Sequence, residues 1–291
     1  MRELYLDCNM GAAGDMLAAA LYELLDEEGR QSFVDTMAAL TPDGVKVSVR
    51  PDTKCGILGS HFDVVINGEE EHSVDAHEHE HSHSHEHAHT HEHTHEHEHV
   101  HTHEHSHPHT HTHEHEHSHT HVHHGMKDVE DIVKSFSGIS DEVKGKIMEV
   151  YGVIAAAESE VHGTTVTEIH FHEVGMMDAI IDVTAVCLLM DMLGADKITA
   201  SPVRVGWGHM RCAHGILPVP APATANILRG VPTYAGGIEA ELCTPTGAAL
   251  LKYFAESFTD QPLMTVSRIG YGMGTKDFEV CNCVRALLAE Q

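Results

Sequence analysis

Histidine alternates with other residues almost without a break from His77 to His124, and this stretch limits what the chain can fold into. It holds 25 of the 32 histidines and contains no Leu, Ile, Phe, Trp or Tyr. Such a segment cannot bury enough apolar surface to offset the entropy lost on ordering. We therefore expect residues 72–124 to be a disordered insertion in a surface loop. Residues 1–71 and 125–291 then form the folded domain, which is long enough to enclose a sizeable core.

The net charge of the chain restricts its partners. It is −28 at pH 7, and residues 69–124 contribute 13 negative charges without any Lys or Arg, so the remainder carries −15. An acidic surface repels phosphate backbones and anionic lipid headgroups, which argues against binding to nucleic acid or to a membrane. The seven cysteines are odd in number and irregularly spaced, and no apolar run reaches the ~20 residues of a membrane span. With no apolar signal region after Met1, we expect a reduced, cytoplasmic protein.

Apolar patterning elsewhere predicts strands that alternate with helices. A short strand at 4–6 leads through a glycine-rich turn to a helix over 15–25. Further helices are predicted over 128–136, 140–162, 178–193, 223–228 and 247–258. Ser140 is the expected N-cap of the second of these, and Gly194 the expected C-cap of the third. Strands are predicted at 45–49, 57–66, 197–205, 263–269 and 280–288, the last two around a loop with Gly270, Gly272 and Gly274. The predicted fold class is α/β, a mixed sheet with flanking helices and a long disordered histidine-rich loop insertion.

The His-x-His repeat predicts metal binding. In extended chain, residues i and i+2 point the same way, so neighbouring histidines can present two imidazoles to one ion. Neutral imidazole suits nickel, zinc, copper and cobalt, and it protonates below about pH 6, where metal uptake should fail. We expect a low-specificity nickel-binding arm from His77 to His124 that collects ions and supplies no rigid catalytic geometry. The alternative is a polar segment with no metal role.

A second cluster joins histidines and carboxylates. If residues 165–172 are extended, His170 and His172 share a face, while Asp178 and Asp182 lie one helical turn apart. Imidazole and carboxylate together suit a transition metal. Glu173 could be a ligand, support a ligand or cap the following helix. Two core histidines beside a capped helix are an equally open interpretation.

The glycine-rich turn of residues 7–16 is a third candidate. A glycine loop between a strand and a helix can cradle a phosphate on backbone N–H groups, which would involve Gly11 and Gly14. Asp7 and Asp15 would repel a bare phosphate and fit a metal better. A plain tight turn is the alternative.

Two later segments complete the set of motifs. His214 lies with His209 and Cys212 in a loop that suits soft or borderline metals. Thr244 and Thr246 open a helix, where hydroxyls and backbone donors favour an anion. The sequence from Cys281 to Cys283 has the wrong spacing for a zinc ribbon and is interpreted as strand.

Five segments together resemble one family, the LarC proteins, which insert nickel into the nickel-pincer cofactor of lactate racemase. They occur in the family's order along the chain: 7–16 (DCNMGAAGDM), 170–182 (HFHEVGMMDAIID), 214–224 (HGILPVPAPAT), 241–250 (ELCTPTGAAL) and 270–274 (GYGMG). A histidine-rich insertion after the first strands is also typical of the family. Each motif alone is modest, but the set is specific.

The resemblance implies a substrate and a reaction. The substrate is pyridinium-3,5-bisthiocarboxylic acid mononucleotide, and the product holds Ni(II) between two sulfurs and a ring carbon. Such a protein is a nickel-inserting cyclometallase of the lyase class, and in the family the step depends on CTP with Mn(II). The apo form of lactate racemase, or of a related enzyme, would be the downstream partner.

The resemblance also assigns roles to residues. Formation of a nickel–carbon bond releases a ring proton, so a general base is needed, and His172 or Glu173 is the expected catalytic residue. The substrate phosphate is expected on Gly11 and Gly14 or on Thr244 and Thr246. The metal ligands are expected among the aspartates and histidines of the motifs: Asp7, Asp15, His170, His172, Asp178 and His214.

Family members often continue into a C-terminal domain that binds the nucleotide triphosphate. This chain ends at Gln291, so we expect CTP and Mn(II) to be bound by the C-terminal half of the same gene product; a homo-oligomer is compatible with this arrangement. The alternative function is that of a non-catalytic nickel storage protein or metallochaperone for another nickel enzyme. Storage needs only the arm, whereas an enzyme needs the cluster at 170–182 and His214 in one site.

Overall fold

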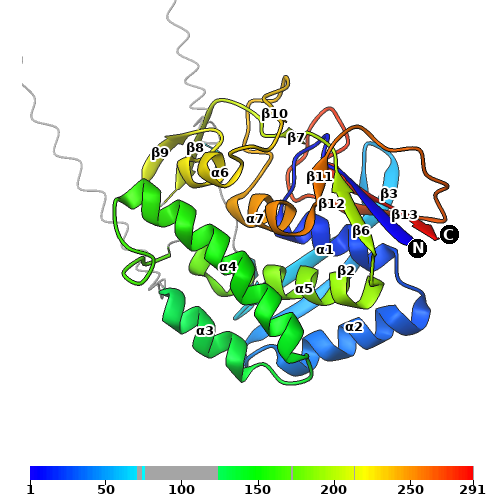
Figure 1. Cartoon of the computed structure of the whole chain (residues 1–291), viewed down its shortest axis with the longest axis horizontal. Coiled ribbons are helices and arrows are strands. Elements are labelled where there is room, and N and C mark those ends of the chain that lie inside the picture. Colours follow the sequence, from blue (N-terminus) through cyan, green and yellow to red (C-terminus); the bar gives the residue numbers. More distant parts are fainter. Residues whose placement is uncertain (71–73, 76–123, 172, 213, 291) are drawn as a thin grey trace, which may run out of the picture. The chain divides into compact units, whose positions relative to one another are not determined.

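The fold is built on a mixed β-sheet, as the alternating pattern predicted (Figure 1). The computed structural model describes residues 1–70, 74–75, 124–171, 173–212 and 214–290, so almost all of the predicted arm and His172 lie outside the described residues. The strands of this sheet are β1 (Arg2–Asp7), β2 (Val45–Lys54), β3 (Ile57–Ile66), β4 (Glu69–Glu70), β6 (Lys197–Ala200), β11 (Ser257–Phe258), β12 (Arg268–Met273) and β13 (Cys283–Glu290).

The order of strands within the described residues is β11-β6-β1-β13-β12-β3-β2, with β4 beside β3. β1 pairs in parallel with β6 and antiparallel with β13, while β12 pairs antiparallel with β13 and in parallel with β3. Strand β1 is therefore central, and the loop that follows it leaves from the middle of the sheet. This topology decides where the glycine-rich turn lies.

Two smaller groups of strands lie beside the main sheet. One is three-stranded, with β8 (His209–Cys212) between β5 (Val74–Asp75) and β9 (Gly215–Pro218). The other pairs β7 (Val203–Arg204) in parallel with β10 (Thr233–Tyr234). The single strand predicted over 197–205 is thus divided into β6 and β7.

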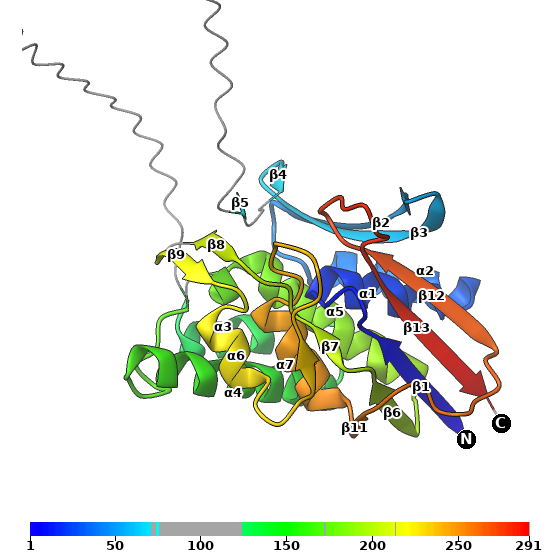
Figure 2. The same ribbon diagram turned by 90° about the horizontal axis from the view of Figure 1, so that it is seen from above.

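Helices gather on one side of the sheet in two layers (Figures 1 and 2). In the inner layer, α1 (Gly14–Glu23) packs on β3, β12 and β13, α2 (Glu27–Leu40) packs on β2, and α5 (Met177–Leu193) packs on α1. In the outer layer, α4 (Asp141–His162) contacts α5 together with α3 (Met126–Ser135), α6 (Pro222–Ile227) and α7 (Pro245–Phe254). A short 3₁₀ turn, η1 (Glu173–Gly175), precedes α5.

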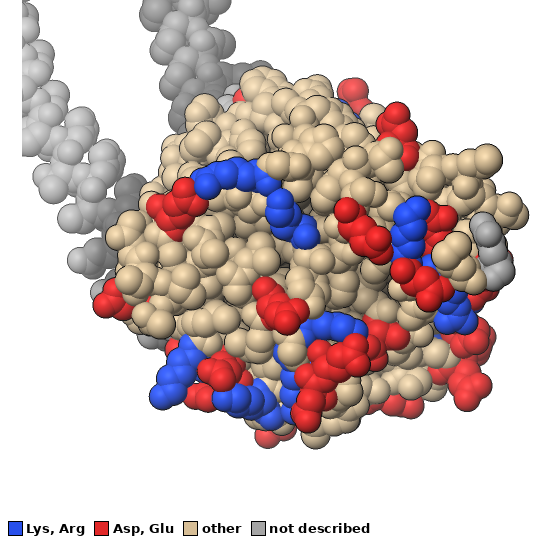
Figure 3. All heavy atoms as spheres, viewed as in Figure 1, with Lys and Arg blue, Asp and Glu red and all other residues tan. Residues whose placement is uncertain are grey.

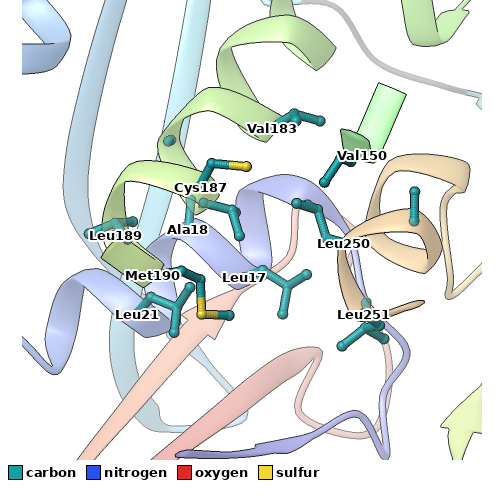
Figure 4. Close-up of a cluster of buried hydrophobic side chains, with 14 of the residues drawn as sticks. Leu17, Ala18, Leu21, Val150, Val183, Cys187, Leu189, Met190, Leu250 and Leu251 are labelled. Atoms are coloured by element: carbon teal, nitrogen blue, oxygen red, sulfur yellow. The ribbon is translucent and has the colours of Figure 1, made fainter. Parts of the chain in front are cut away.

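The core lies where α1, α5, α4 and α7 meet (Figure 4). The cluster takes Leu17 and Leu21 from α1, Val183 and Cys187 from α5, and Leu250 from α7. α5 has α1 and β3 on one side and the outer helices α4 and α7 on the other. Its sequence is therefore apolar on nearly every face. Burial of this kind stabilises a fold by about 25 cal/mol per Å² of apolar surface.

The prediction of a loop at Gly270 and Gly272 was wrong, since both residues lie in β12. A Cβ added at Gly270 would come within 2.0 Å of the carbonyl oxygen of Ala20, and one at Gly272 within 1.8 Å of that of Met16. Glycine at these positions lets α1 lie directly on the strand. The strand predicted from 280 is also shorter than expected, because β13 begins at Cys283.

Two helix caps are as the sequence predicts. The Ser140 side chain accepts a hydrogen bond from Val143 N at 3.2 Å, and Gly194 ends α5 in the left-handed region with φ +54°. Among the described residues, none of the helices combines the length and apolarity that crossing a bilayer would require.

Candidate functional site

The glycine-rich turn joins β1 to α1, and its glycines are required by close approach. Gly11 has φ +88°, and a Cβ there would lie 1.8 Å from the carbonyl oxygen of Leu242. At Gly14 an added Cβ would lie 2.6 Å from Oδ2 of Asp182. The turn is therefore packed against one segment on each side.

The first of these segments is the predicted anion-binding start of α7. Ala12 N donates to Leu242 O at 3.0 Å, and Thr244 N donates back to Ala12 O at 3.0 Å. The Thr244 hydroxyl caps α7 by accepting from Gly247 N at 3.1 Å, and it lies 3.0 Å from the Thr246 hydroxyl. Two motifs more than 200 residues apart in the sequence thus lie side by side, with the N-termini of α1 and α7 adjacent.

The second segment carries carboxylates. Asp15 in the first turn of α1 meets Asp182 of α5, and Asp178 lies one turn before Asp182. Burial raises the pKa of Asp182 well above its usual range, and the charges of Asp15 and Asp178 raise it further. A hydrogen bond from Asp15 N lowers this pKa and only partly offsets the increase. Burial also raises the pKa of Asp15, and nearby His61 opposes this increase. Negative charge here is thus destabilised, so a cation would be stabilised.

His61 and Asp63 of β3 adjoin these carboxylates, and the sequence analysis did not single them out. Both are buried. His61 Nδ1 lies 2.7 Å from Met273 O and Nε2 lies 3.2 Å from Asp63 Oδ1, while Arg50 Nε lies 2.9 Å from Asp63 Oδ2. A carbonyl only accepts hydrogen bonds, so Nδ1 of His61 is in position to donate to Met273 O, whereas Oδ1 of Asp63 is buried without a hydrogen-bond partner. The available signal was a His-x-Asp pair on one face of an otherwise apolar strand.

Asp7, predicted as a metal ligand, is engaged within the protein. Its Oδ2 accepts from Arg285, with Nε at 2.9 Å, and its Oδ1 accepts from Asn9 N at 3.1 Å. Asp7 therefore orients the beginning of the glycine-rich turn.

The predicted histidine ligands lie on another part of the unit. His170 is exposed and forms an isolated bridge with Gly125, while residues 166–168 form a turn and not the predicted extended chain. His214 is exposed in the turn between β8 and β9, where its ring centroid lies 4.8 Å from that of His162 of α4. Partial burial and His162 together lower the pKa of His214. Glu173 begins η1, directly before the helix of Asp178.

The described residues on either side of 76–123 contact segments next to these histidine motifs. Before the arm, Val74 pairs with Arg211 and Asp75 with Met210 in β8, close to His214. After it, Phe171 N donates to His124 O at 3.0 Å, next to His170. The described residues that flank 76–123 therefore lie beside segments predicted to bind metal.

Within the described residues, no three His, Cys, Asp or Glu side chains are arranged to hold a metal ion. The predicted ligands fall into separate places: Asp15 with Asp178, Asp7 with Arg285, and His214 with His162. A resident manganese ion, as implied by the resemblance, has no fitting donor set in this part of the chain. Nickel as a passing substrate would need rearranged or additional ligands.

These features define a class of protein with a mixed α/β fold. Its glycine-rich turn lies at the N-termini of α1 and α7 and beside buried carboxyl groups whose pKa values are raised. Acidic and basic side chains are interspersed on the face in Figure 3, with no basic tract of the kind that follows a nucleic acid. The chain belongs to the nickel insertion protein family, whose family model matches residues 4–291. The resemblance to the LarC family is thereby confirmed.

Curated relatives agree with this assignment. Proteins named pyridinium-3,5-bisthiocarboxylic acid mononucleotide nickel insertion protein are 36% identical over 296 residues in Clostridium kluyveri, 40% over 292 in Clostridium acetobutylicum and 34% over 297 in Geobacillus kaustophilus. Each alignment covers 100% of this chain but only 63%, 64% and 60% of the relative. The chain therefore spans less than two thirds of the length of these relatives. No solved structure matches it.

Proposed function

We propose that this chain binds nickel and inserts it into pyridinium-3,5-bisthiocarboxylic acid mononucleotide, as the names of its relatives state for those proteins. One observation carries the proposal: the glycine-rich turn contacts both the start of α7 and Asp182. A candidate anion site and a candidate cation site thus share one turn. A nucleotide that must receive a metal ion requires this combination.

The proposed roles follow this arrangement. Thr244 and Thr246, with Gly11 and Gly14 in the adjacent turn, bind the phosphate. Asp15 and Asp178 attract Ni(II), whose charge relieves the repulsion described above. His172 or Glu173, just before α5, accepts the ring proton as the nickel–carbon bond forms.

The wider reaction belongs to the same proposal. The protein would act as a cyclometallase in the cytoplasm, and its product would activate lactate racemase or a related enzyme. CTP and Mn(II) would be held by residues other than those described, among which no group of His, Cys, Asp or Glu side chains fits a metal ion. A nickel reservoir that serves another enzyme is the competing function, and it depends on the arm alone.

The test is a nickel titration of a variant in which residues 77–123 are replaced by a short Gly/Ser linker. This variant keeps β5 and the bond between His124 and Phe171, so both attachment points of the arm survive. We expect about one site per chain to remain when nickel is titrated against a competing chelator. Loss of all binding would identify the chain as a reservoir.

Point variants in this background locate the site. Asp178→Asn and His172→Ala should each weaken the remaining nickel site by at least about tenfold, which corresponds to ~1.4 kcal/mol. Asp191→Asn is the matched control, since it lies on the same helix but is exposed and paired with Lys146 at 2.9 Å. Equal losses in all three variants would contradict a local metal site.

A further inference from the structure

Arg204, at the end of β7, adjoins the beginning of the glycine-rich turn. Its backbone N donates to Cys8 O at 3.3 Å, which ties β7 to the turn. The guanidinium is partly buried: Nε has no hydrogen-bond partner, and Nη1 approaches only the sulfur of Met10, at 3.2 Å. Sulfur is a weak acceptor, so this charge is poorly satisfied by the protein.

Three other arginines of the chain have carboxylate partners. Arg50 pairs with Asp63, Arg229 with Glu160 and Arg285 with Asp7. Among the described residues, Arg204 has no carboxylate partner within 4.0 Å. Nε of Arg30 also has no hydrogen-bond partner, but Nη2 of Arg30 donates to Glu23 O at 2.7 Å and its guanidinium lies 5.4 Å from the centroid of the Tyr22 ring. A buried polar group without a partner is destabilising, and a bound anion would remove that penalty.

The surroundings of Arg204 form a fitted cradle. Gly236 has φ +69°, and a Cβ there would lie 2.2 Å from Arg204 Nε, so only glycine leaves room for the guanidinium. Tyr234, on the neighbouring strand β10, donates from its hydroxyl to Asn9 Oδ1 at 3.0 Å. Guanidinium, phenol and amide thus converge on the first residues of the turn.

Backbone donors of the turn itself are largely occupied. Asn9 N donates to Asp7, Gly11 N to Cys8 O, and Ala12 N to Leu242 O. An anion beside this part of the turn therefore needs a side-chain donor. Arg204 presents a planar fork that matches two oxygens of a phosphate, which a lysine cannot do.

We propose that Arg204, supported by Tyr234 and Asn9, binds the phosphate of a nucleotide at the opposite end of the turn from Asp15 and Asp182. The inference deepens the proposed function, because it assigns recognition of the nucleotide to a residue outside the five family segments. In this inference the Arg204 subsite takes the place of the phosphate site at Thr244, Thr246, Gly11 and Gly14, because Gly11 N already donates to Cys8 O. The turn then has a basic end for phosphate and an acidic end for nickel. The phosphate could belong to the pyridinium mononucleotide or to CTP, and the experiment separates these sources.

The experiment measures ligand binding by the full chain in excess chelator, without metal. Nicotinic acid mononucleotide serves as the pyridinium probe, its riboside as the same molecule without phosphate, and CTP as the second source. Affinity is measured by calorimetry and by fluorescence of Trp207, the single tryptophan, which is 45% exposed and three residues from Arg204. Pyridinium rings quench indole emission, so occupancy of this region is reported directly.

We expect Arg204→Gln to weaken mononucleotide binding by about 10- to 100-fold, the worth of a charge-assisted hydrogen-bond pair. Binding of the riboside should be unchanged, and Arg204→Lys should give an intermediate loss. If CTP binding is lost while mononucleotide binding is kept, the subsite holds the triphosphate. Unchanged affinity for both nucleotides, or no nucleotide binding by the unmodified chain, would overturn the proposal.

Controls separate this inference from the proposed function. Arg229→Gln removes an exposed, ion-paired arginine and should leave nucleotide binding intact. Gly236→Ala should displace the guanidinium of Arg204 and weaken mononucleotide binding as Arg204→Gln does, although the arginine is still present. This second variant keeps the proposal testable if Arg204→Gln folds poorly. Arg204→Gln should bind nickel with the same affinity as the unmodified chain. Nickel binding therefore tests the proposed function separately from the phosphate subsite.

Discussion

The hydroxyl of Tyr151 fixes the 3₁₀ turn η1, which precedes α5, and the effect of removing this hydroxyl on stability can be calculated. Tyr151 lies on α4, is completely buried, and donates to Val174 O of η1 at 3.1 Å. Tyr151→Phe keeps the ring and its contact with Phe171, whose centroid lies 5.9 Å away. The variant therefore loses one hydrogen bond and leaves a buried carbonyl unsatisfied, with almost no cavity.

The expected loss of stability is about 1–3 kcal/mol, the cost of an unsatisfied buried acceptor. For a folded region of this size, each kcal/mol lowers Tm by roughly 2–4 °C. Tyr151→Ala should cost more, about 3–5 kcal/mol, because it also removes the ring. Burial and the charges of Asp178 and Asp182 raise the pKa of Tyr151 well above its usual range, so the hydroxyl is protonated and can donate throughout the accessible pH range.

The assay is urea denaturation followed by far-ultraviolet circular dichroism in excess chelator. Tyr253→Phe is the matched control, because its hydroxyl also donates to an acceptor, Glu149, but in an exposed position. We expect the control to change the free energy of unfolding by less than about 0.5 kcal/mol. If Tyr151→Phe is no more destabilising than Tyr253→Phe, the hydrogen bond does not anchor η1 and the reasoning fails.

Two further changes test the packing and charge of the site. Asp182→Asn should raise stability at neutral pH. The pKa of Asp182 is higher in the folded than in the unfolded chain, so the unmodified chain loses stability as the pH rises between these two pKa values. The loss is at most about 1.4 kcal/mol per pH unit. Denaturation midpoints from pH 4 to 8 should show this advantage shrinking toward pH 4, and a pH-independent difference would exclude charge repulsion. Gly247→Ala would place a Cβ 2.1 Å from Ala12 O and should destabilise the fold by at least about 1–3 kcal/mol. Gly145 of α4 has open space around it, so the control Gly145→Ala should stabilise the fold by about 0.5–1 kcal/mol. Equal changes of Tm in the two variants would refute the close approach at Gly247.

Local features of the fold could be predicted from the sequence because local physics decides them. Ser140 and Gly194 cap their helices as their chemistry requires, and the turn at Gly11 joins a strand to a helix. Helix α2 also had a signal that was missed, since Asp26 accepts from Gly29 N at 2.8 Å as an N-cap. Helix α2 was not predicted because only three of its residues, Phe33, Met37 and Leu40, form its buried apolar face.

Long-range contacts could not be predicted in this way. His61 and Arg204 reach the turn from strands distant in sequence, and neither belongs to a motif with a recognisable spacing. Gly272 was assigned to a loop because glycine usually breaks a strand, whereas here it admits the backbone of α1. Such packing depends on which elements meet, and a single sequence does not encode that in any local pattern.

The position of β13 between β1 and β12 has a consequence for how the protein is made. Asp7 and its partner Arg285 are 278 positions apart, so β1 leaves the ribosome long before its antiparallel neighbour exists. Pairings of such high contact order form slowly, and an unpaired apolar strand is prone to aggregate or to recruit chaperones. The order of synthesis therefore makes the histidine-rich stretch available before the frame that orients the glycine-rich turn. Only after residue 290 has been translated can β13 pair along its full length with β1 and complete that frame.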